Sequence, residues 1–84
     1  MQITFKLYAS LTDYLPADKR RSNEMSLDVP EGATIEQVTE PFQLPQKLVH
    51  LVLINGSYVP PEQHAARELQ AGDVLAIWPP IAGG

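Results

Sequence analysis

A nearly continuous apolar run, Val49–Ile54, leads directly into Asn55-Gly56, and this stretch narrows the possible folds more than any other. Such a run is expected of a central strand with both faces covered. Asn-Gly is the strongest two-residue signal for a hairpin turn, because the favoured turn needs positive φ at both positions. Residues 57–59 should then form a short returning strand, which Pro60-Pro61 ends.

Two further strands are predicted near the N-terminus. In residues 2–9, the apolar residues Ile3, Phe5 and Leu7 alternate with polar ones, which is the period of a half-buried strand. Residues 25–29 alternate in the same way and should pair with the first strand as an antiparallel hairpin. The long connection between them should hold a short helical turn around residues 10–15 and then a solvated loop.

One helix is predicted between the two hairpins. Thr34 and Gln37 match a capping box, and apolar residues follow at helical spacing. Pro41 lacks an N–H and disfavours helix at the residue before it, so the helix should be short or broken. A last strand over residues 74–78 follows, and its alternation should turn Leu75 and Ile77 into the core.

The order β, β, α, β, β, β predicts an α+β chain with the β-grasp, or ubiquitin-like, layout. In this layout a mixed sheet of four to five strands carries one main helix across it. We expect a β-grasp domain over residues 1–78 and an extended C-terminal reactive tail over residues 79–84.

Composition excludes several classes of function. The 84 residues suit one domain, and the absence of cysteine excludes disulfides, thiolate catalysis and cysteine-zinc sites. A net charge of −4 argues against nucleic-acid binding. No apolar run approaches a membrane span, and no signal peptide begins the sequence, so we expect a cytoplasmic protein that contacts no membrane.

The sequence ends on Gly83-Gly84, directly after Pro79-Pro80. Two glycines let a backbone thread a narrow channel and present an unhindered carboxylate, which attack on the α-phosphate of ATP would activate as an acyl-adenylate. The two prolines should stiffen the base of the tail and hold it away from the sheet. We therefore predict that Gly84, with Gly83, is the reactive site.

Residues 72–84, Gly-Asp-Val-Leu-Ala-Ile-Trp-Pro-Pro-Ile-Ala-Gly-Gly, resemble the C-terminus of the MoaD/ThiS family of sulfur carriers. The Pro-Pro-x-x-Gly-Gly ending is most similar to MoaD, the small subunit of molybdopterin synthase. The opening residues 5–9, the turn at residues 30–34 and the hairpin at residues 54–56 are similar to the family as well.

The resemblance implies a mechanism and partners. An E1-like enzyme of the MoeB/ThiF type would use ATP to adenylate Gly84, and sulfur from a persulfide would leave a thiocarboxylate there. A MoaE-like large subunit, or another sulfur acceptor, would take the sulfur for molybdenum or tungsten cofactor synthesis. The chain would be a sulfur-carrying co-substrate with no bound cofactor. Alternatives are a ThiS-like donor for thiamin thiazole synthesis, a ubiquitin-like modifier conjugated through Gly84, and a non-covalent binding module.

The end of the last strand should contact the partner. Ala76 and Trp78 are expected on its outer face, where an exposed tryptophan would anchor an interface, although Trp78 could equally cap the edge of the core. The partner-binding prediction comprises Ala76, Trp78, Pro79, Pro80 and Ile81. No metal site is expected: His50, taken as the polar face of a strand, and His64 are not at ligand spacing. Charged residues, including Asp73, are interpreted as surface groups.

Overall fold

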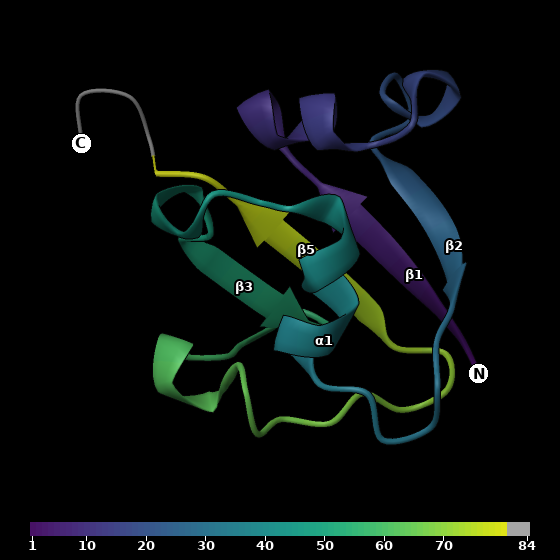
Figure 1. The fold of residues 1–84 in the computed structure, drawn as a ribbon, viewed down its shortest axis with the longest axis vertical. Helices are drawn as coiled ribbons and strands as arrows, with labels where there is room; N and C mark the ends of the chain where they lie inside the picture. The colour runs from purple at the N-terminus through teal and green to yellow at the C-terminus, as the bar shows by residue number, and fades with distance from the viewer. Residues whose placement is uncertain (81–84) are drawn as a thin grey trace.

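A computed structural model describes residues 1–80 (Figure 1). The five strands in this part of the chain are β1 (Gln2–Leu7), β2 (Glu24–Asp28), β3 (Leu51–Ile54), β4 (Ser57–Tyr58) and β5 (Val74–Trp78), and its one α-helix is α1 (Ile35–Thr39). Short 3-10 helices cover Ala9–Tyr14, Ala17–Lys19, Glu40–Phe42, Gln46–Leu48 and Pro61–Gln63. Within these residues, no helix has both the length and the apolar character needed to cross a membrane.

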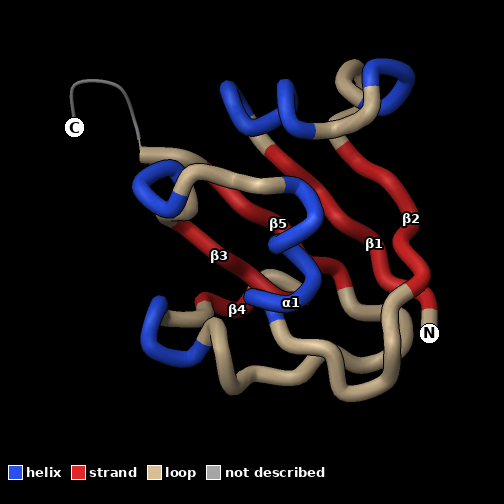
Figure 2. Tube along the Cα trace, viewed as in Figure 1, coloured by secondary structure: helices blue, strands red, loops and turns tan. Residues whose placement is uncertain are grey.

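The strands form one mixed sheet in the order β2-β1-β5-β3-β4 (Figure 2). The neighbouring strands β1 and β5 run parallel, with β5 at the centre of the sheet, and every other neighbouring pair is antiparallel. The helix α1 lies across one face of the sheet (Figure 1). This confirms the predicted α+β class and the β-grasp arrangement, with five strands and one main helix.

The core fills the space between α1 and the sheet. On β1 and β5, the predicted inward residues are fully or almost fully buried, with relative exposure of 0–2%. Phe42, from the turn after α1, packs its ring on Phe5 with 4.7 Å between the centroids. The residues of these elements that belong to the core cluster are Ile3, Phe5, Leu7, Ile35, Val38, Val52, Ile54, Leu75 and Ile77.

The predicted capping box begins α1. The Gln37 N–H donates to Thr34 Oγ1 at 3.3 Å, and the Thr34 N–H donates to Gln37 Oε1 at 3.0 Å, so two main-chain donors are satisfied at the helix start. The helix has only five residues and gives way to a 3-10 turn that contains Pro41. The expected short helix is confirmed, with the proline as its physical cause.

The β3–β4 turn is held from outside by Asp73, which the sequence analysis wrongly interpreted as a surface charge. Asn55 and Gly56 have φ of 52° and 84°, as the predicted hairpin requires. Asp73 is only 8% exposed. Its carboxylate accepts hydrogen bonds from Asn55 Nδ2 at 2.9 Å and from the Gln70 N–H at 2.8 Å, and these bonds offset the cost of burial.

The third strand differs from the prediction in two respects. It begins at Leu51, so His50 lies before the strand and is exposed, although its N–H donates to the Trp78 carbonyl at 3.2 Å. Its two faces are also unequal, because Val52 and Ile54 are buried whereas Leu51 and Leu53 are half-buried. The helix covers only one face of the sheet, and the other face of β3 is left partly open.

Candidate functional site

The face of the sheet opposite α1 carries an apolar strip over three neighbouring strands. The pairing register places Leu51 opposite Trp78, Leu53 opposite Ala76, and Leu53 opposite Tyr58. These side chains share one face because residues paired across a sheet point to the same side. Tyr58 is the most exposed large apolar residue described, at 57%. We call this group the open face, and its members are Tyr8, Leu51, Leu53, Tyr58, Ala76 and Trp78.

An aromatic pair closes the end of the open face where β5 stops. The ring of Tyr8 stacks on the indole of Trp78 with 3.9 Å between centroids and 8° between planes. Both side chains are half-buried, so the outer surface of the pair remains accessible. Trp78 therefore lies outside the core, as its place on the strand predicts, and the stack on Tyr8 restricts its rotamers.

Main-chain hydrogen bonds fix the point at which the chain leaves the sheet. The Tyr8 N–H donates to the Ile77 carbonyl at 3.1 Å, and the His50 N–H donates to the Trp78 carbonyl. The next two residues are Pro79 and Pro80, which have no N–H and cannot donate to either neighbouring strand. The main-chain hydrogen bonds of β5 to its neighbouring strands therefore end at Trp78, because the two prolines have no N–H to donate. Pro79 is half-buried and Pro80 is exposed.

Ala76 lies on the open face as expected, but it is only 6% exposed. Its cross-strand neighbours are Lys6 on β1 and Leu53 on β3, and these longer side chains flank the small alanine. The apolar strip therefore exposes little surface at Ala76, and the ammonium group of Lys6 borders it on the β1 side. Lys6 Nζ in turn lies 3.8 Å from Oε1 of Glu24 on β2 and forms an ion pair with it.

The remaining predicted site residues, Ile81, Gly83 and Gly84, lie outside the described residues. The structure brings Ala76, Trp78, Pro79 and Pro80 together at the end of β5, which is the base of the predicted tail. It also adds Leu51, Leu53 and Tyr58, which the sequence analysis did not select. Their signal was the alternation in residues 51–54 and the register set by the Asn55-Gly56 turn.

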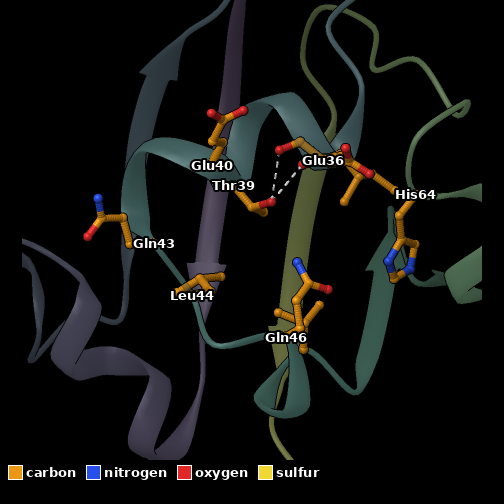
Figure 3. A pocket seen from close by; sticks show the side chains of 9 residues that line it. Glu36, Thr39, Glu40, Gln43, Leu44, Gln46 and His64 are labelled. Atoms are coloured by element: carbon orange, nitrogen blue, oxygen red, sulfur yellow. Dashed lines mark hydrogen bonds between the residues drawn. The ribbon is translucent and has the colours of Figure 1, made fainter.

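A separate cavity of about 530 Å³ lies on the helix side of the sheet (Figure 3). Its apolar lining residues are Ile35, Leu44 and Val49, and its acidic lining residues are Glu36 and Glu40. His64, also at this cavity, is held by a hydrogen bond from Nε2 to the Val59 carbonyl at 3.0 Å. Within residues 1–80, no three or more His, Cys, Asp or Glu side chains gather in a way that could hold a metal ion.

The sequence matches a known family over almost its whole length. The model of the family described as Mut7-C ubiquitin matches residues 1–82. Among curated proteins, none matches the sequence at a significant level.

Several solved structures share the fold. SAMP1 from Haloferax volcanii is 24% identical, with 100% of both chains covered and a TM-score of 0.70. The HVO 2177 protein of the same organism is 23% identical, with 100% of this chain and 87% of that one covered and a TM-score of 0.76. A chain from the complex of subunits 1 and 2 of the Helicobacter pylori molybdopterin-converting factor is 15% identical, with 100% of both chains covered and a TM-score of 0.61. The resemblance to MoaD-like ubiquitin folds is thereby confirmed.

Proposed function

Because the chain belongs to the Mut7-C ubiquitin family, we propose that it is a ubiquitin-like sulfur carrier whose reactive group is the Gly84 carboxylate. One observation carries the proposal: Gly83-Gly84 follows a β-grasp domain whose last strand is ended by two prolines. Glycines at these positions suit a segment that an enzyme must enclose without steric hindrance. The likeness of the fold to a molybdopterin-converting factor supports the same reading.

The chemistry needs a partner enzyme that binds ATP. A carboxylate oxygen of Gly84 attacks the α-phosphate, pyrophosphate leaves, and an acyl-adenylate forms. A persulfide of the sulfur donor then attacks the acyl carbon and AMP leaves, which gives an acyl disulfide. A second thiol of the donor cleaves the S–S bond, so the donor is oxidised to a disulfide and Gly84 keeps the sulfur as a thiocarboxylate. The sulfur resides on the chain terminus, which is consistent with a carrier that has no cysteine.

We assign the open face to docking of an E1-like activating enzyme of the MoeB/ThiF type. Half-buried apolar side chains next to the base of the tail suit an interface core, and Trp78 and Tyr8 are of the residue types that contribute most to binding. Cytoplasmic ATP would serve the reaction. The sulfur acceptor we propose is a MoaE-like large subunit that makes molybdopterin, and the pairing of two subunits in the Helicobacter pylori complex supports a partner of this kind.

Intact mass spectrometry tests the proposal directly. The native protein should end at Gly84, and incubation with an E1-like enzyme, ATP and a persulfide donor should add about 16 Da, the difference between sulfur and oxygen. Deletion of Gly84 should abolish this gain while the melting temperature stays nearly unchanged, because a chain end contributes little stability. A native chain that continues beyond Gly84, or a deletion variant that still accepts sulfur, would overturn the mechanism.

A second candidate function is protein modification, in which an amine of a target lysine attacks the acyl carbon of the adenylate, AMP leaves, and an isopeptide bond forms. The fold likeness to the H. volcanii small archaeal modifier protein 1, at 22% identity and a TM-score of 0.68, favours keeping this alternative. The remaining alternative is a ThiS-like carrier that donates its sulfur to thiamin thiazole synthesis. A lysine adduct of the full chain on a target protein would select the modifier, and labelled sulfur recovered in a pterin or a thiazole would select between the carriers.

A further inference from the structure

The outer edge of β2 presents main-chain groups that no strand of the sheet uses. The Val29 N–H donates to the Met1 carbonyl at 2.8 Å, and the Leu7 N–H donates to the Asn23 carbonyl at 3.0 Å. These bonds show that the odd-numbered residues of this segment face β1. Alternate residues of an antiparallel strand face opposite sides, so Ser26 and Asp28 direct their N–H and C=O groups away from the sheet.

A groove of about 650 Å³ runs beside this edge, on the side of the sheet covered by α1. Leu27 and Val29 of the β2 region form one wall, and Val38, Pro41 and Phe42 form the other. Leu27, Val29 and Phe42 are half-buried and therefore retain accessible apolar surface. An open strand edge next to an apolar groove is the arrangement by which proteins bind extended peptides through strand addition.

The charges at the groove select the occupant. Its charged lining residues are both acidic: Asp28 Oδ1 lies 3.2 Å from the Met1 ammonium, whereas Glu31 makes no ion pair within residues 1–80. A second copy of the chain is disfavoured, because antiparallel pairing of two β2 edges would bring Glu24 and Asp28 close to the same carboxylates of the other copy. An extended segment with basic flanking residues complements these charges.

We infer that the β2 edge and the groove between β2 and α1 bind an extended, aliphatic peptide segment with basic flanks, as an added antiparallel strand. Peptide residues opposite Ser26 and Asp28 exchange main-chain hydrogen bonds with them. The peptide residue opposite Leu27 faces the same side as Leu27, so its side chain enters the groove against Val38 and Phe42. Backbone pairing supplies affinity, and the groove selects aliphatic side chains at alternate positions.

This binding site is separate from the tail and the open face. The sheet order places β2 at one edge, whereas β5 is central and the open face lies on the opposite side from α1. A peptide on the β2 edge would leave Trp78 and Pro80 accessible. The inference does not depend on the proposed sulfur chemistry, and it holds for a carrier, a modifier or a binding module.

The test uses the full chain labelled with ¹⁵N and a synthetic probe, acetyl-Lys-Val-Thr-Ile-Thr-Val-Lys-amide. Titration should shift the amide signals of Ser26, Asp28 and Val38, with no saturable shift at Trp78. N-methylation of the two threonine amides, which face β2, should weaken binding about tenfold or more, whereas methylation of the three aliphatic amides, which face away, should leave it nearly unchanged. The reverse methylation pattern would overturn the proposed antiparallel strand.

Two charge variants test whether the groove prefers a peptide with basic flanking residues. Glu31→Lys should weaken probe binding roughly threefold, with a smaller difference in about 0.5 M salt, because exposed charges are screened. Glu62→Lys has the same change in net charge on an exposed 3-10 turn outside the groove, and it should bind as the unmodified chain does. Equal binding of a glutamate-flanked probe, self-association through β2, or no shift at Ser26 with about 5 mM probe would overturn the inference.

Discussion

The ring of Tyr8 lies nearly parallel to the indole of Trp78, at 3.9 Å between centroids, and the pair joins the ends of the neighbouring parallel strands β1 and β5. Tyr8 follows β1 and Trp78 ends β5, and a main-chain bond from the Tyr8 N–H to the Ile77 carbonyl supports the stack. The base of the tail is therefore anchored on two sides, by side-chain stacking and by the backbone. The direction in which the chain leaves the sheet is set before Pro79.

The stack should contribute measurably to stability. In a double-mutant cycle of Tyr8→Ala and Trp78→Ala, we expect a coupling free energy of about 0.5–1.5 kcal/mol, since aromatic pairs add this much beyond their buried area. Urea unfolding of the four proteins measures it. The same cycle with Tyr58→Ala in place of Tyr8→Ala should give a coupling near zero, because Tyr58 lies on the far edge strand. Zero coupling in the first cycle would contradict the stacked geometry.

Asp73 should be essential for the β3–β4 turn although it lies outside it. Asp73→Ala removes the acceptors of Asn55 Nδ2 and the Gln70 N–H, and we expect a loss of about 1–3 kcal/mol in the free energy of unfolding. Asp18→Ala, an exposed residue in a 3-10 turn, should change it by less than about 0.5 kcal/mol. The midpoint of urea unfolding distinguishes the two, and equal midpoints would contradict the role of the buried carboxylate.

The sequence predicted those features whose signals are local. Thr34 and Gln37 are three residues apart and form the expected capping box, and Asn55-Gly56 forms the expected turn, because each depends on its own backbone. The burial of Asp73 was missed since its partner, Asn55, is 18 residues away in the sequence. Such a contact follows only from the strand order.

The same limit applies to the candidate sites. Trp78 was placed on the outer face from alternation alone, and the structure agrees. The groove beside β2 was not anticipated, because its walls, at Leu27 and Phe42, come together only when β2 is an edge strand and α1 crosses the sheet. The low exposure of Ala76 likewise depends on its neighbours Lys6 and Leu53, and not on its own sequence.

Gly56 should be needed for its backbone conformation alone. Its φ is 84°, and a Cβ placed on it would meet no atom within 4 Å, so a substitution costs backbone strain without a steric clash. Gly56→Ala should lower the free energy of unfolding by about 1–2 kcal/mol, as left-handed conformations do for non-glycine residues. Gly56→Asn should cost less, because asparagine tolerates this region. Thermal unfolding of both variants tests this, and equal losses would argue for a contact instead of strain.

The open face should govern docking of the activating enzyme. Leu51 lies opposite Trp78 in the register and is half-buried, so Leu51→Lys places an ammonium in the proposed interface, while its aliphatic stem can still cover the sheet. We expect the KM of ATP-dependent Gly84 activation for this chain to rise about tenfold, with the maximal rate unchanged, because docking is weakened before chemistry begins. Gln63→Lys adds the same charge on an exposed turn away from this face and should leave KM unchanged. If Leu51→Lys is folded by its melting curve and retains the original KM, the enzyme docks elsewhere.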